Sequence, residues 1–134
     1  MQNEEQVIQD HLKQKGLTAG KTPSGLHYVI TNQGDGAKVE ARKKVKVNYT
    51  GKLLNGNVFD SSVEAKFGHV EPIEFTVGVG QVIKGWDEGL QLFNVGGKGT
   101  LFIPSSLGYG IRGAGASIPP NSILVFDVEV VGQK

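Results

Sequence analysis

The centre of the chain reads Val82-Ile83-Lys84-Gly85-Trp86-Asp87-Glu88-Gly89-Leu90-Gln91-Leu92-Phe93. Its large apolar residues recur every three or four positions, which is the spacing of one face of an α-helix. These residues are Ile83, Trp86, Leu90 and Phe93. The pattern predicts one short central helix over residues 82–93, and the glycine pair at 96–97 is expected to end it.

The segments on both sides of this helix alternate apolar and polar residues, as half-buried β-strands do. The alternation predicts strands at residues 26–31, 45–49, 73–77, 100–103 and 123–131. In the first of them, Leu26, Tyr28 and Ile30 alternate with His27 and Thr31, which indicates one buried face.

A hairpin turn is predicted at Asn55-Gly56, because these residue types tolerate the positive φ angles of a tight turn. Phe59 then lies on the returning strand. About five antiparallel strands and one helix make an α+β fold, in which a curled antiparallel sheet wraps around the helix.

The first residues predict an amphipathic helix that Asn3 caps and Gly16 ends. One face of it carries a narrow apolar stripe formed by Val7, Ile8, His11, Leu12 and Lys15. Two interpretations stay open: the helix lies on its own domain or is a loosely held end, or it is the remnant of a dimerisation or spacer element. Residues 18–24 have the composition of a linker. We therefore expect a helix and linker at residues 1–24 and one domain at residues 25–134.

Composition excludes several classes of protein. The 134 residues suit a single domain, and 14 basic against 13 acidic side chains give a net charge of +1, so we expect no nucleic-acid partner. No cysteine is present, which excludes disulfides and thiolate chemistry. No signal peptide or membrane span is apparent, and we expect no membrane association. Localisation stays open: cytoplasmic as the sequence stands, or periplasmic or cell-envelope if a signal peptide was removed.

Motifs of metal, nucleotide and nucleophilic enzymes are missing. The three histidines, His11, His27 and His69, lie in unrelated segments without the spacing of metal ligands. The glycine-rich stretches fail the phosphate-loop and dinucleotide patterns, and no nucleophile elbow occurs. We therefore expect neither a metal nor a cofactor.

A glycine-rich loop near the C-terminus brings apolar groups together without ionisable chemistry. It begins at Tyr109, ends in Ile118-Pro119-Pro120 and leads into the strand that carries Phe126. Arg112 is the one charged residue inside it. A site of this kind suits an extended apolar peptide better than a hydrolytic reaction.

Successive motifs of the chain resemble those of the FKBP-type peptidyl-prolyl isomerases, in the same order. They are Val47-Asn48-Tyr49-Thr50-Gly51, Phe59-Asp60-Ser61-Ser62, Val82-Ile83-Lys84-Gly85-Trp86-Asp87-Glu88-Gly89-Leu90, Tyr109-Gly110, Ile118-Pro119-Pro120 and Leu124-Val125-Phe126-Asp127-Val128-Glu129. Together they cover most of residues 26–131. The resemblance implies a half β-barrel with a shallow apolar pocket between sheet and helix.

The resemblance also implies roles for single residues. The catalytic set would be Tyr49, Asp60, Trp86, Tyr109 and Phe126. The substrate-binding set would be Phe59, Ile73, Val82, Ile83 and Ile118. Trp86 would form the pocket floor, and the Ile83 N–H and the Tyr109 hydroxyl would donate to carbonyls of a bound peptide. Taken singly, Trp86, Ile83 and Phe126 would normally be residues of a plain hydrophobic core, and it is the ordered set of motifs that favours a pocket.

The implied activity is cis–trans isomerisation of X-Pro bonds in proline-containing peptides or unfolded proteins, with macrolides as inhibitors. The alternative is a non-catalytic chaperone or peptide-binding module that uses the same pocket. The segment Ser61 to Glu71 is longer than in many short family members. Ile73 replaces an aromatic residue of many eukaryotic ones, and Ala114 replaces a histidine of some. We expect these departures to affect peptide preference and macrolide affinity.

Overall fold

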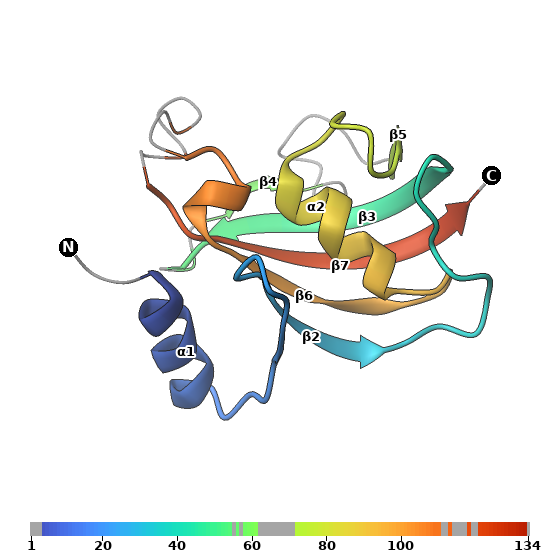
Figure 1. The fold of residues 1–134 in the computed structure, drawn as a ribbon. Helices are drawn as coiled ribbons and strands as arrows, with labels where there is room; N and C mark the ends of the chain where they lie inside the picture. Colours follow the sequence, from blue (N-terminus) through green and yellow to red (C-terminus); the bar gives the residue numbers. More distant parts are fainter. Residues whose placement is uncertain are drawn as a thin grey trace.

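The structure is a computed structural model and describes residues 4–54, 56, 58–61, 72–110, 113, 118 and 121–133. Helices and strands follow one another along the chain (Figure 1) in this order: α1 (Glu4–Gln14), β1 (Gly20–Lys21), β2 (His27–Asn32), β3 (Lys44–Leu53), β4 (Val58–Ser61), β5 (Ile73–Thr76), α2 (Lys84–Gly89), the 3₁₀ turn η2 (Leu90–Leu92), β6 (Lys98–Ile103), the 3₁₀ turn η3 (Ser105–Leu107) and β7 (Leu124–Gln133).

The strands form one antiparallel sheet in the order β1-β2-β6-β7-β3-β4, and β5 pairs with β3 beside β4. The sheet curves, and α2 lies across its concave side (Figure 1). The predicted α+β class, a curled antiparallel sheet around one short helix, is confirmed. Among the described residues the sheet has seven strands rather than about five. The strand that the prediction missed is β1, in the segment read as a linker, because two residues are too few to show alternation.

The concave face carries the main core. β3 and β7 pair along most of their length, with Tyr49 opposite Val128 and Gly51 opposite Phe126. The predicted apolar faces of both strands point inward and are almost fully buried. They comprise Val45, Val47 and Tyr49 on β3 and Leu124, Phe126, Val128 and Val130 on β7.

The central helix is shorter than predicted. Ile83 precedes it as an extended residue with φ −58° and ψ 152°, and the regular helix covers only Lys84–Gly89 before the chain tightens into η2. Phe93 is extended again. The apolar spacing continues across these junctions because a tight turn and a helix both return a side chain to the same face after three or four residues. Periodicity therefore marked the buried side correctly and the helix ends incorrectly.

Two glycines bring α2 against the sheet. A Cβ added at Gly85 would lie 2.7 Å from Cγ2 of Ile103, and one added at Gly89 would lie 2.8 Å from Cδ1 of Leu101. Both contacts are shorter than carbon atoms tolerate. The helix backbone thus packs directly on β6.

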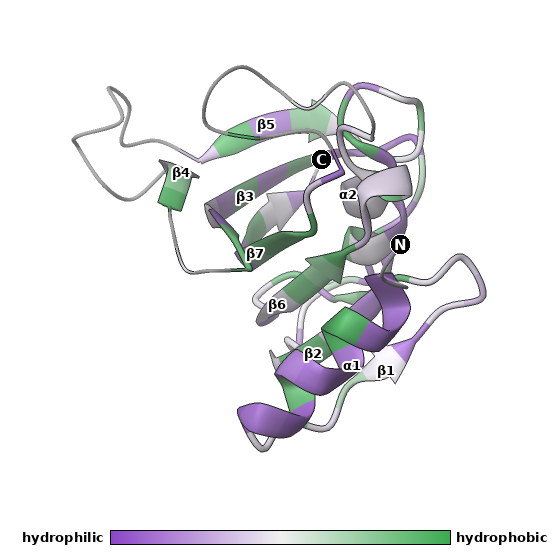
Figure 2. Ribbon diagram, turned by 90° about the vertical axis from the view of Figure 1, so that its left-hand side faces the viewer, coloured by the Kyte–Doolittle hydropathy of each residue, from purple (hydrophilic) through white to green (hydrophobic). Residues whose placement is uncertain are grey.

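The N-terminal helix lies on the other face of the sheet. Ile8 and Leu12 are buried against Phe102 and Val125, whose sequence neighbours Leu101, Ile103, Leu124 and Phe126 belong to the main core. Figure 2 shows α1 beside β1 and β2. The apolar stripe of α1 is therefore covered by the sheet of its own chain, as the first interpretation expects. A dimer through this helix and a domain boundary after residue 24 stay predictions.

The packing of α1 on this face of the sheet corrects the prediction for β2. His27, which the alternation placed opposite the buried face, is only 3% exposed, because α1 covers that side of the strand. On α1 itself, His11 stacks near Phe102 with ring centroids 5.9 Å apart. Burial lowers the pKa of His11, and the charges of Lys15 and Lys52 lower it further. The helix therefore docks most favourably with a neutral His11.

In the part of the chain that the structure describes, no helix is both long enough and apolar enough to cross a membrane.

The close packing of α2 gives a first prediction. Gly85→Ala should lower the free energy of unfolding by roughly 1–3 kcal/mol, because the added methyl group overlaps Ile103, although alanine is the better helix former. Gly132→Ala is the matched control, since a Cβ there meets nothing within 4 Å. Urea unfolding of both variants measures the difference. Equal stability of the two variants would contradict the packing argument.

Candidate active site

A cavity of about 470 Å³ lies between α2 and the concave face of the sheet. Its walls come from segments far apart in the sequence: β3, β4, β5, the turn before α2, α2 itself, the turn after η3, and β7. Among the described residues it is lined by Tyr49, Phe59, Ile73, Gln81, Val82, Ile83, Trp86, Tyr109 and Phe126. None of these side chains is a carboxylate, an imidazole or an amine.

Trp86 is at the centre of an aromatic cluster. Its ring meets Tyr49 edge-on with centroids 5.1 Å apart and Phe126 edge-on at 5.2 Å. Phe75 packs against it from β5 at 5.7 Å. Edge-to-face contacts of this kind stabilise aromatic pairs beyond their burial and fix ring orientation. Trp86 is only 4% exposed, so it forms a floor rather than a protruding wall.

The polar atom of this floor, Nε1 of Trp86, is buried and lacks a hydrogen-bond partner in the described part of the chain. A buried donor without an acceptor costs free energy. The aromatic contacts therefore hold the ring in this position against a polar penalty.

Gly51 makes room for the aromatic walls. A Cβ at this position on β3 would lie 2.6 Å from Cε1 of Phe126 and 2.8 Å from Cζ of Phe59. These two rings meet edge-on, with centroids 5.6 Å apart. Glycine thus lets Phe59 and Phe126 contact each other across β3 at one end of the cavity.

At the start of α2, the backbone offers a donor. The carbonyl of Ile83 accepts hydrogen bonds from the N–H groups of Trp86 and Asp87 at 3.0 and 3.2 Å. The N–H of Ile83 itself has no acceptor in the described part of the chain. Since Ile83 also lines the cavity, this N–H is available to a carbonyl of a bound molecule.

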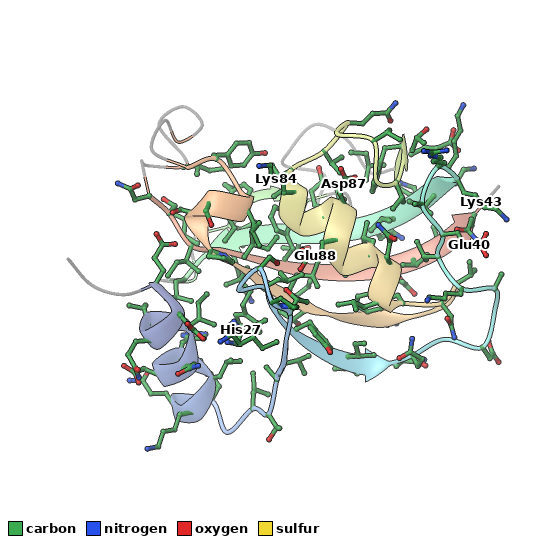
Figure 3. All side chains as sticks on the ribbon, viewed as in Figure 1. His27, Glu40, Lys43, Lys84, Asp87 and Glu88 are labelled. Atoms are coloured by element: carbon green, nitrogen blue, oxygen red, sulfur yellow. The ribbon has the colours of Figure 1, made fainter. Side chains whose placement is uncertain are left out.

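The turn before α2 is held from the helix. The Asp87 carboxylate accepts from the N–H groups of Gly78 and Gly80, both at 2.9 Å, and both glycines have φ near +80°. Figure 3 shows Asp87 on α2 beside this turn. Gln81, the next residue, accepts at Oε1 from the N–H of Thr76 at 2.8 Å. These bonds fix the backbone that leads to Val82 and Ile83.

The structure brings together eight of the ten predicted site residues along the cavity: Tyr49, Phe59, Ile73, Val82, Ile83, Trp86, Tyr109 and Phe126. Ile118 is not among the lining residues. It is 5% exposed and belongs to the core cluster that includes Trp86 and Phe126. Asp60 lies on β4 opposite Gly51, but its side chain is outside the described residues. The roles of these ten residues stay predictions.

Some predicted features cannot be placed. Arg112 and Ala114 of the glycine-rich loop and the long segment at 62–71 lie outside the described residues. Two contributors were missed by the sequence analysis, Gln81 in the lining and Asp87 behind it. No periodicity marks Gln81. The glycines at 78 and 80 were the available signal for Asp87, because positive φ angles expose N–H groups that require an acceptor.

Across the described ranges, no three side chains of histidine, cysteine, aspartate or glutamate gather where they would hold a metal ion.

The geometry agrees with comparisons to known proteins. Residues 35–131 match the model of the family described as FKBP-type peptidyl-prolyl cis-trans isomerase. The chain belongs to this family.

Among its relatives, a probable FKBP-type peptidyl-prolyl cis-trans isomerase of Haemophilus influenzae is 56% identical over 87% of this chain and 46% of its own length. FK506-binding protein 2 of Dictyostelium discoideum is 50% identical over 87% of both chains. FkpA from Escherichia coli, a solved structure, matches with a TM-score of 0.83 and 38% identity over 98% of this chain and 59% of its own. The chain thus spans about half the length of some curated relatives and most of others.

The bonds of Asp87 give a second prediction. Asp87→Asn should weaken binding of a proline-containing peptide by roughly three- to tenfold, because Gly78 and Gly80 donate to different carboxylate oxygens and asparagine replaces one of these acceptors with an NH2 donor. Isothermal titration measures the affinity. Asp127→Asn is the control, as it removes the same charge from an exposed residue whose carboxylate accepts from Thr100 and pairs with Lys52. Equal affinities for the two variants would show that the turn does not depend on Asp87.

Proposed function

We propose that this chain catalyses cis–trans isomerisation of X-Pro peptide bonds and so assists protein folding. The observation that carries the proposal is the cavity lined by aromatic and aliphatic side chains, with Trp86 as its floor. Family membership and relatives that are named isomerases support it.

The chemistry needs no charged catalyst. Rotation about a peptide bond loses amide conjugation, with a barrier of about 18–20 kcal/mol, and uncatalysed X-Pro exchange takes roughly tens to hundreds of seconds. The planar amide is more polar than the twisted transition state, so water stabilises the ground state more. An apolar cavity removes that preference, and each ~1.36 kcal/mol of selective stabilisation gives a factor of ten.

The predicted site residues would supply the parts of such a mechanism. The prolyl ring would lie on Trp86, with Tyr49 and Phe126 as walls. The Ile83 N–H and the Tyr109 hydroxyl would donate to carbonyls that flank the rotating bond, which holds both sides while the bond turns. Tyr109 is 40% exposed and therefore accessible at the mouth of the cavity. Asp60 would add a polar contact at the rim, and Ile118 would support the site from the core.

The proposed partners are proline-containing segments of unfolded proteins, with macrolides as competing ligands. A non-catalytic chaperone or peptide-binding module that uses the same cavity is the second candidate, because an aromatic cavity binds apolar segments whether or not they turn over. We also propose a homodimer through α1. Ile8 and Leu12 are already buried within their own chain, so the apolar surface near this helix that is left for a partner is that of Leu17, which is 41% exposed.

An exchange assay separates isomerase from binding module. We expect micromolar protein to accelerate cis–trans exchange of an X-Pro test peptide in NMR exchange spectra, and a macrolide of the FK506 type to abolish the acceleration. A rate equal to that of the blank, with peptide binding still detectable, would refute the enzyme and favour the binding module.

The roles of two lining residues can be separated by substitution. Tyr109→Phe should reduce kcat/KM by roughly two- to tenfold, the loss of one hydrogen bond, with unchanged stability. Phe126→Ala should remove most peptide binding and lower the free energy of unfolding by roughly 3–5 kcal/mol, because the ring is 4% exposed and contacts Trp86. Activity of folded Phe126→Ala at the wild-type level would show that catalysis occurs elsewhere.

A further inference from the structure

The N-terminal helix makes a hydrogen-bonded contact with a segment that leads to the cavity. The N–H of Ser105 donates to one carboxylate oxygen of Glu4 at 2.6 Å, and the hydroxyl of Ser105 donates to the other at 2.6 Å. Both carboxylate oxygens are used. The two residues are 101 positions apart in the sequence. Hydrogen bonds to a carboxylate are roughly twice as strong as neutral ones.

Ser105 in turn fixes the backbone on both sides of Tyr109. Its carbonyl accepts from the N–H of Gly108 at 3.0 Å and from the N–H of Gly110 at 2.9 Å. Gly110 has φ +58°, which closes the turn around Tyr109. Tyr109 then reaches the cavity. A continuous series of bonds therefore runs from Glu4 through Ser105 to the backbone that carries Tyr109.

The helix that carries Glu4 is itself well anchored. Ile8 and Leu12 pack on Phe102, three residues before Ser105, and on Val125. Further along, Thr22 and Ser24 donate to the carboxylate of Glu88 at 2.5 to 2.7 Å, which ties the segment to α2 (Figure 3). Residues 4–24 lie outside residues 35–131, the part of the chain that matches the family model, yet they bond to both elements that present Tyr109 and Trp86.

We propose that Glu4 is a positioning residue of the active site, which orients Tyr109 through Ser105. This inference rests on the proposed isomerase function. Tyr109 is 40% exposed, and the turn that carries it is held by the bonds from Gly108 and Gly110 to the Ser105 carbonyl. Glu4 accepts two hydrogen bonds from Ser105, the residue at which that turn begins.

The experiment compares two substitutions in the same helical turn. Glu4→Gln should lower kcat/KM for a prolyl peptide about three- to tenfold, since one oxygen acceptor is lost and a donor group replaces it. Glu5→Gln is the matched control: it removes the same charge one residue away, where the carboxylate pairs with exposed Lys21, and should leave kcat/KM within about twofold. Assays are run well below the unfolding temperature of each variant.

A double-mutant cycle distinguishes positioning from stability. In a Tyr109→Phe background, Glu4→Gln should cause no further loss, because the hydroxyl that Glu4 orients is gone. Ser105→Ala, which keeps the N–H bond and removes the hydroxyl bond, should give an intermediate loss with Tyr109 present.

Three results would overturn the inference: an undiminished loss from Glu4→Gln in the Tyr109→Phe background, an equal loss from Glu5→Gln, or no loss from Glu4→Gln in an active enzyme. A wild-type chain that neither accelerates exchange nor binds the peptide would refute the proposed function first, and the inference with it. The wild-type measurement therefore separates the two failures.

Discussion

The position of Trp86 is the constraint on which the cavity depends. Its ring contacts Tyr49, Phe75 and Phe126, which come from β3, β5 and β7, so three strands fix it at once. The ring reaches them because Gly85 and Gly89 let α2 lie directly on β6. Its N–H is buried without an acceptor among the described residues, so these contacts must outweigh a polar penalty. A helix displaced by the width of a methyl group would separate Trp86 from its partners.

Charged groups hold this apolar site from outside. Asp87 accepts from the turn before α2, Glu88 from the segment after β1, and Glu4 from the first residue of η3. Asp87 and Glu4 bind segments that lead to lining residues, and Glu88 lies on the helix that carries Trp86, but none of the three carboxylates lines the cavity. The arrangement combines strong, directional bonds with a cavity whose described lining residues carry no charge. A reaction that gains from excluding water is favoured when the charged groups lie outside the cavity and the apolar groups line it.

The sequence alone predicted which side of each strand of the central pair is buried, because alternation reports the environment of one face directly. The burial of Tyr49 and Phe126 follows from this alternation. The sequence could not predict that His27 is buried too. The helix that covers His27 is α1, which is separate from β2 in the sequence, and its docking does not change the residue pattern of β2. The ends of α2 and the role of Gln81 were missed for a related reason. They depend on bonds such as those of Asp87 to Gly78 and Gly80, which no local pattern encodes.

A donor that meets a peptide has to be accessible, and accessibility removes the packing that would fix it. Tyr109 illustrates this conflict, because it is the lining residue that combines 40% exposure with a hydroxyl. The chain resolves the conflict through the backbone: Ser105 restrains Gly108 and Gly110, and Glu4 restrains Ser105 across nearly the whole chain. The conformational entropy of the turn is then lost when the protein folds and not when the peptide binds. An N-terminal extension beyond the family's common core is well suited to this task, since it adds order at the mouth of the cavity without adding a group to its lining.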